Sequence, residues 1–150
     1  MKKFNFSLQK VLEIKEQLLK NLKNELSNMN EQMKNIEVEI RTLTGKYKDT
    51  NVEFIEKSSS GITSGEISYY KMFMNTILKS IEKKEADKLL LNKKMEDKRH
   101  EIINMNMEIS SLEKLRDKEF EKYNHSLTKS EEIFIDEFVS NAKMLKLNKF

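Results

Sequence analysis

Apolar residues recur at alternating steps of four and three positions through the first third of this 150-residue chain. Only Lys15 and Thr50 interrupt the series. Its apolar members are Leu8, Leu12, Leu19, Leu22, Leu26, Met29, Met33, Ile36, Ile40, Leu43, Tyr47 and Phe54. A repeat that averages 3.5 residues drifts off one face of a straight helix, so it stays buried only where two helices wind around each other. The series therefore predicts one long arm of a coiled coil.

The composition favours long helices over a compact globule. The chain has no proline and only three glycines, and 37% of its residues are hydrophobic while 35% are charged. Proline is the strongest helix breaker, and a narrow seam between two helices needs fewer apolar residues than a globular core. The chain also lacks cysteine, which excludes a disulfide framework and thiolate metal sites.

The uncharged stretch SSSGITSG at positions 58–65 holds two of the three glycines and predicts a bend. We expect the first helix, about residues 8–57, to end at this bend. A second helix, about residues 66–124, is expected to begin after it. Two long helices joined by so short a connection must run antiparallel, side by side.

Short signals mark the start of both helices. Ser7 is placed to cap the first turn of the first helix, and Phe6 is expected to pack against Val11 as a hydrophobic staple. Thr63 is placed as the N-cap of the second helix, with Glu66 three residues later as its partner in a capping box.

The second helix carries a matching but less regular seam. Its members are Ile67, Tyr70, Met74, Ile77, Ile81, Lys84, Lys88, Leu91, Met95, Lys98, Ile102, Met105, Ile109 and Leu112. Lysines at such positions can keep their charged ends in water while their stems are buried. The alternative is that Leu89 or Leu90 replaces them through a local change of register. With Phe54 near Tyr70, equal rise per residue places the start of the first helix opposite residues 112–116.

The chain from about residue 115 onward then has no partner within a simple hairpin. Its apolar residues are Phe120, Tyr123, Leu127, Ile133, Phe134, Ile135, Phe138, Val139, Leu145 and Leu147. A second capping box, TKSEE at 128–132, predicts a C-terminal helical extension at about 129–146, after a break near 124–128. This extension either folds back as a third helix or docks into another protein. The predicted fold is therefore all-α: one domain over residues 1–150, a long antiparallel two-helix coiled-coil hairpin with this extension.

We find no pattern of catalytic, cofactor-binding or metal-ligating residues. The stretch GITSGE lacks the lysine and the preceding strand of a phosphate-binding loop, and His100 and His125 lie far apart without cysteine partners. The formal net charge is only +3, which does not favour nucleic acid as a partner. The longest aliphatic or aromatic runs are three residues, so we expect no membrane insertion and a cytoplasmic location.

Three stretches in order resemble the bacterial flagellar export protein family FliJ: FNFSLQKVLEIKE, GITSGEISYYKMFMNTILKSIE and FIDEFVSNA. The resemblance implies a non-enzymatic component of the flagellar type III export apparatus, with a fold similar to the central stalk of rotary ATPases. Its implied partners are the hexameric export ATPase, the cytoplasmic region of the membrane export gate, and export chaperones. The implied location is peripheral, on the cytoplasmic side of the cell membrane.

The resemblance also suggests contact residues. By position, the candidates for the export gate are Leu43, Tyr47, Tyr70, Phe73 and Ile77, of which Phe73 alone lies off the seams. The candidates for the ATPase ring are Phe4, Phe6, Val11, Phe120, Ile133, Phe134, Asp136, Glu137 and Phe138.

Three other functions fit the same architecture. One is the equivalent stalk of a virulence type III secretion system. Another is a general coiled-coil chaperone or scaffold that forms homodimers through the apolar extension. The third is a nucleic-acid-binding helix pair, which the near balance of charge disfavours.

Overall fold

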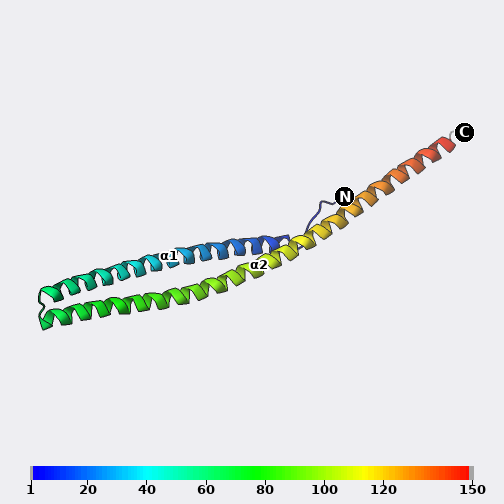
Figure 1. Ribbon diagram of the computed structural model, residues 1–150. Coiled ribbons are helices and arrows are strands. Elements are labelled where there is room, and N and C mark those ends of the chain that lie inside the picture. The colour runs from blue at the N-terminus through cyan, green and yellow to red at the C-terminus, as the bar shows by residue number, and fades with distance from the viewer. Residues whose placement is uncertain (1, 149–150) are drawn as a thin grey trace. The chain divides into compact units, whose positions relative to one another are not determined.

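Two helices make up nearly all of the protein in a computed structural model that describes residues 2–148. Helix α1 spans Gln9–Ser60 and helix α2 spans Ser64–Leu147, and residues 2–148 contain no strand (Figure 1). The internal contacts divide the described chain into two units, residues 20–103 and residues 2–19 with 104–148. We call them the hairpin unit and the terminal unit.

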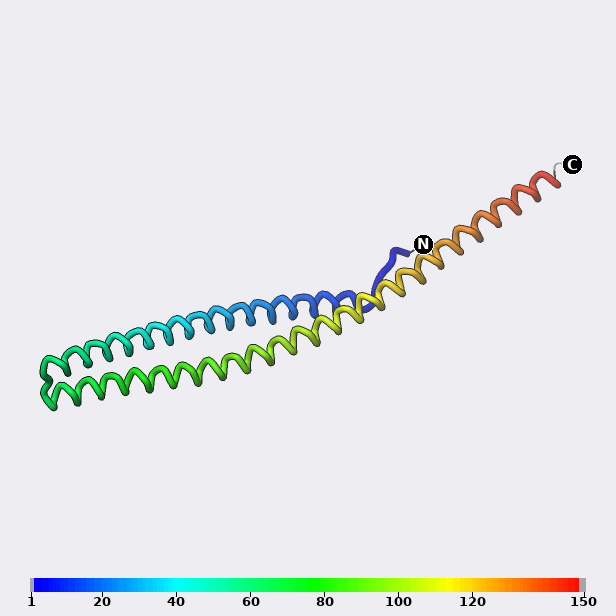
Figure 2. The backbone as a smooth tube through the Cα atoms, in the orientation of Figure 1, coloured from blue at the N-terminus to red at the C-terminus, as the bar shows by residue number. Residues whose placement is uncertain are grey.

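In the hairpin unit, α1 and α2 run antiparallel, side by side (Figures 1 and 2). The ring of Phe54 lies 5.5 Å from the ring of Tyr70, close to the bend. Farther along the helices, Lys84 Nζ lies 2.6 Å from a carboxylate oxygen of Glu39. These contacts confirm the predicted helical hairpin.

The two predicted seams are the buried surfaces of the helices. All of the predicted seam residues are at least partly buried. In the hairpin unit, the seam residues with the least exposed side chains are Tyr70, Ile77, Leu91 and Met95. Most of the others are half-buried, because each helix of a pair covers only one stripe of its partner. The core is therefore a single line of side chains.

The seam lysines keep their positions instead of yielding to the neighbouring leucines. Lys98 Nζ lies 2.7 Å from Glu25 of α1, and its side chain is only 18% exposed. Leu89 and Leu90 remain 73% and 56% exposed, so the alternative register is not adopted. The lysine stems lie in the seam and their ammonium groups pair with glutamates across it.

Because of this pairing, the stability of the protein should fall when the pH becomes strongly alkaline. The hydrogen bond to Glu25 raises the pKa of Lys98 above its ordinary value of 10.5. A raised pKa in the folded state gives a contribution that is complete below pH 10.5 and is lost as the pH rises through the folded-state pKa. We expect the urea midpoint to fall less steeply above that pH in Lys98→Met than in the natural chain, with exposed Lys79→Met as the control. Equal pH profiles in all three proteins would contradict this role of Lys98.

The bend is shorter than the predicted 58–65. Only Gly61, Ile62 and Thr63 lie between the helices (Figure 2). Ser58 stays helical, and its hydroxyl donates to the carbonyl of Phe54 at 2.7 Å, so a serine run does not by itself end a helix. Gly61 turns the chain with a φ of 109°, a conformation that other residues rarely adopt. Thr63 Oγ1 accepts a hydrogen bond from the Glu66 amide at 3.2 Å, which matches the predicted cap.

Two glycines of the hairpin unit should respond oppositely to alanine. Gly45 lies inside α1, and a methyl group there would meet no atom within 4 Å. We expect Gly45→Ala to raise the free energy of unfolding by about 1 kcal/mol, because alanine is the better helix former. Gly61→Ala should lower it, because of the positive φ. Urea unfolding followed by circular dichroism measures both; a destabilised Gly45→Ala variant would show that this glycine has another role.

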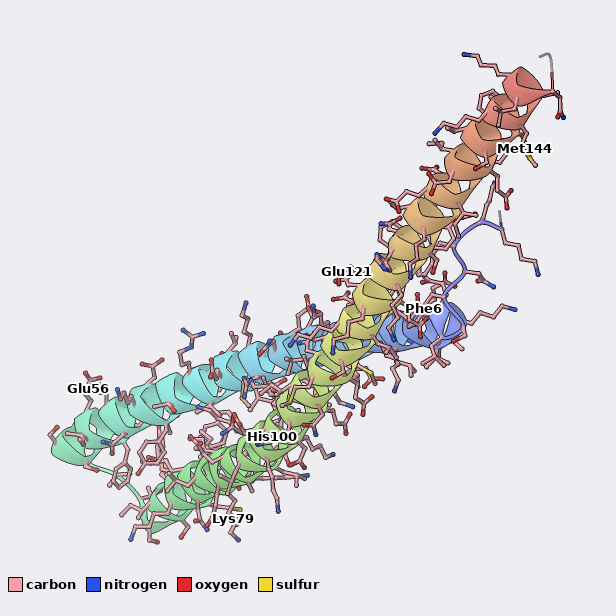
Figure 3. The ribbon with its side chains drawn as sticks, turned by 90° about the vertical axis from the view of Figure 1, so that its right-hand side faces the viewer. Phe6, Glu56, Lys79, His100, Glu121 and Met144 are labelled. Carbon is pink, nitrogen blue, oxygen red and sulfur yellow. The ribbon has the colours of Figure 1, made fainter. Side chains whose placement is uncertain are left out.

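In the terminal unit, the N-terminal segment lies along α2 (Figure 3). The ring of Phe4 is 5.1 Å from that of Phe120, and the Tyr123 hydroxyl donates to the carbonyl of Lys2 at 2.8 Å. Helix α1 begins where the amide of Gln9 donates to the carbonyl of Phe6, at 3.1 Å. Phe6 is 4% exposed, whereas Val11 is 40% exposed. The capping role of Ser7 and the staple stay predictions.

Helix α2 passes through residues 124–128 without the expected break. Thr128 does not begin a new helix here; its hydroxyl donates to the carbonyl of Asn124 at 3.0 Å, one turn back along α2. A threonine bonded in this way fits inside a helix, so the TKSEE signal is not used as a cap. Residues 129–147 consequently continue α2, and no third helix folds back in the described chain.

Candidate interaction surfaces

The residues predicted to contact the export gate lie in the hairpin unit and differ widely in exposure. Tyr70 and Ile77 are buried, at 6% and 5% exposure, and Leu43 and Tyr47 are half-buried. Phe73 is 41% exposed. Burial commits the first four mainly to the seam, so Phe73 alone of this set offers much of its side chain to a partner.

Two further residues join Phe73 in an exposed patch. Tyr69 stacks on Phe73 with a centroid distance of 6.3 Å and an interplanar angle of 9°. Tyr69 and Met72 are 66% and 72% exposed. We call Tyr69, Met72 and Phe73 the hairpin-end patch. The signal for it in the sequence is the pair of aromatic residues one turn apart and off the seam.

Tyr70 holds the helices together beneath this patch. Its hydroxyl donates to Glu53 Oε1 at 3.0 Å, and Lys57 Nζ lies 5.7 Å from its ring centroid. With its contact to Phe54, it joins both helices near the bend. A partner could reach it only by separating the helices, so its role is structural.

Alanine substitutions should separate these two roles. Tyr70→Ala removes a buried ring and should lower the free energy of unfolding by about 3 kcal/mol. Phe73→Ala removes a partly exposed ring and should cost less than about 1 kcal/mol. Thermal and urea unfolding of both variants measures the difference. Equal losses would mean that Phe73 is needed as much for the fold as Tyr70.

The residues predicted to contact the ATPase ring fall into a covered and an open group. Phe6 is buried, Phe4 is half-buried, and Phe120 is 46% exposed under the N-terminal segment. In contrast, every described residue from 128 to 148, which we call the tail, is exposed. Ile133, Phe134, Asp136, Glu137 and Phe138 all belong to it. The structure thus joins Phe4 with Phe120 and leaves the tail residues uncovered.

A further apolar stripe on α1 contains one predicted ring contact, Val11, and two residues that were not predicted, Ile14 and Leu18. Val11, Ile14 and Leu18 are 40%, 60% and 45% exposed, and their spacing of three and four places them on one face of the helix. This spacing is visible in the sequence, but it lies beside the more regular seam, and the stripe was not predicted as a separate surface. The tail also contains uncovered Ile135, Val139 and Leu145 outside the predicted set.

Two other kinds of functional feature are absent from the part of the chain that the structure describes. Within residues 2–148, no three histidine, cysteine, aspartate or glutamate side chains come together as metal ligands. No helix in the same range has both the length and the apolar character needed to cross a membrane. The notable surface features are large apolar side chains left in water.

These observations define an all-helical protein of the antiparallel coiled-coil class with exposed apolar surfaces. A comparison with protein families matches residues 4–147 to FliJ, described as Flagellar FliJ protein. The match covers nearly the whole chain, so the chain belongs to this family and is a component of flagellar protein export. Comparisons with curated proteins and with solved structures found no match.

Proposed function

We propose that this protein is a non-enzymatic stalk and adaptor of the flagellar export apparatus. Its terminal unit binds the hexameric export ATPase, its hairpin-end patch binds the cytoplasmic region of the export gate, and export chaperones are further partners. It works at the cytoplasmic side of the cell membrane, as a peripheral protein. The exposed apolar tail of α2 is the observation that carries the proposal, together with membership of the family.

The tail has the composition of a binding surface. Phe134 and Phe138 are 70% and 68% exposed, and large aromatic residues often supply most of the energy of an interface. A fully exposed helix gains little from its own packing and needs a partner to bury such side chains. A protein ring that encloses the tail would bury them from several sides at once.

The hairpin-end patch is suited to a smaller contact. The stacked rings of Tyr69 and Phe73 lie on the solvent side of α2, above the buried Tyr70. Stacking restricts both rings before a partner arrives, which reduces the entropy lost on binding. A rigid aromatic pair of this kind supports the assignment to the gate.

Binding at the tail can alter the ATPase without any catalytic group from this chain. A ligand shifts an equilibrium between states of its partner only by binding one state more tightly. If the tail favours the assembled or active ring, both assembly and hydrolysis rise. The tail then acts as an allosteric ligand of the ring.

The test is to add the protein to its cognate export ATPase and measure oligomer formation and hydrolysis. We expect both to rise, and Phe138→Glu to weaken the effect at least about tenfold, because it places a charge in the buried contact. The matched control is Met107→Glu, which changes an exposed apolar residue of α2 outside the tail. An ATPase that responds equally to the natural chain and to Phe138→Glu would rule out the tail as the ring contact.

A further inference from the structure

The N-terminal segment covers part of α2 although it is not helical. We call residues 2–6, which precede the first turn of α1, the strap. Phe4 is half-buried and Phe6 is 4% exposed. Lys3 and Asn5, which alternate with them, are exposed. Alternate side chains of an extended chain point to opposite sides, so one side of the strap is covered and the other lies in water.

The strap contacts α2 through a cluster of three aromatic rings. The ring of Phe4 lies 5.1 Å from that of Phe120, edge to face, and 5.6 Å from that of Tyr123. Within residues 2–148, the hydrogen bond from the Tyr123 hydroxyl to the carbonyl of Lys2, at 2.8 Å, is the one that joins the strap to α2. Tyr123 therefore holds the strap both with its ring and with its hydroxyl.

The strap is held more weakly than the helices. Its five residues belong to neither helix of the described chain. One buried ring, one half-buried ring and one hydrogen bond to α2 must offset the entropy that is lost when these residues are ordered. A segment with so few contacts can open locally while the rest of a protein stays folded. The strap can therefore leave α2 while the two helices stay paired.

The strap also lies next to the uncovered part of α2. Its Lys2 carbonyl is bonded to Tyr123, Leu127 one turn later is half-buried, and the exposed tail begins at residue 128. Phe120 is 46% exposed even with the strap in place. Release of the strap would uncover this aromatic pair and extend the apolar surface of the tail along α2, with no change in the helix itself.

The strap explains how covered residues could serve as contacts for a ring. Phe4, Phe6 and Phe120 were predicted to contact the ATPase, yet the first two are turned away from solvent and the third lies under the strap. We propose that the strap is an autoinhibitory contact. When it is closed, the export ATPase can bind only the tail; when it is open, Phe120 and Tyr123 join the binding surface. This inference rests on the proposed function, because it concerns the regulation of the same surface.

Competition between the strap and the ring follows from this geometry. The two cannot occupy the same side of Phe120 and Tyr123 together, so the ring binds the open form more tightly than the closed form. The apparent affinity is then reduced in proportion to the fraction of molecules that are open. A change that weakens the strap should therefore raise the apparent affinity for the ring.

Tyr123→Phe is the selective test, because it removes the hydroxyl and keeps the ring. Loss of one hydrogen bond between neutral groups should shift the equilibrium toward the open strap by about fivefold. Tyr47→Phe is the matched control, because the Tyr47 hydroxyl forms no hydrogen bond within residues 2–148.

Opening of the strap can be measured without any partner. The natural chain has no tryptophan, so Phe4→Trp supplies a single fluorescent ring in the strap. On addition of urea, we expect this fluorescence to change at a lower concentration than the circular dichroism of the helices. Added to Phe4→Trp, Tyr123→Phe should lower the fluorescence midpoint, and Tyr47→Phe should leave it unchanged. Coincident fluorescence and helix transitions in all three proteins would show that the strap opens only when the helices unfold, and would overturn the inference.

Stimulation of the cognate export ATPase then tests the regulation. Tyr123→Phe should reach half-maximal stimulation at a concentration about fivefold lower than the natural chain, and Tyr47→Phe at the same concentration as the natural chain. An equal or higher concentration for Tyr123→Phe would refute autoinhibition and leave the proposed function standing. Absence of stimulation by the natural chain and by both variants would instead refute the proposed function, and autoinhibition with it.

Discussion

A single line of side chains between two helices stabilises this protein, and most other features of the structure depend on it. Neither helix has a second layer behind it, so residues such as Ile36 and Met74 are only half-buried even at the centre of the seam. Such a core tolerates a lysine more easily than a globular core does, because water lies one side-chain length away. This explains why Lys98 can occupy a seam position when Glu25 receives its ammonium group.

The seams and the hairpin were predictable because they depend on spacing, which the chain displays directly. Each predicted seam residue is at least partly buried, and Thr63 caps α2 as its position suggested. The ends of elements were less predictable, because their signals have more than one structural use. The serines before Gly61 and the threonine at 128 return hydrogen bonds to carbonyls one turn back, so segments that resemble helix ends remain helical.

The contact residues of the candidate surfaces could be predicted from the sequence only in part, for a different physical reason. Tyr70 and Phe73 both lie near the bend, but the ring of Tyr70 is buried in the seam whereas the ring of Phe73 is partly exposed to water. A difference of less than one turn along the chain decides between a structural and a binding role.

The three-residue link between α1 and α2 has one more consequence. Gly61 supplies the left-handed backbone at the reversal, the serines before it remain helical, and Thr63 caps the start of α2. The seams of α1 and α2 cover each other within one molecule because the chain reverses over these three residues. A backbone conformation confined to residue 61 is thus a condition for burial along the whole length of both seams.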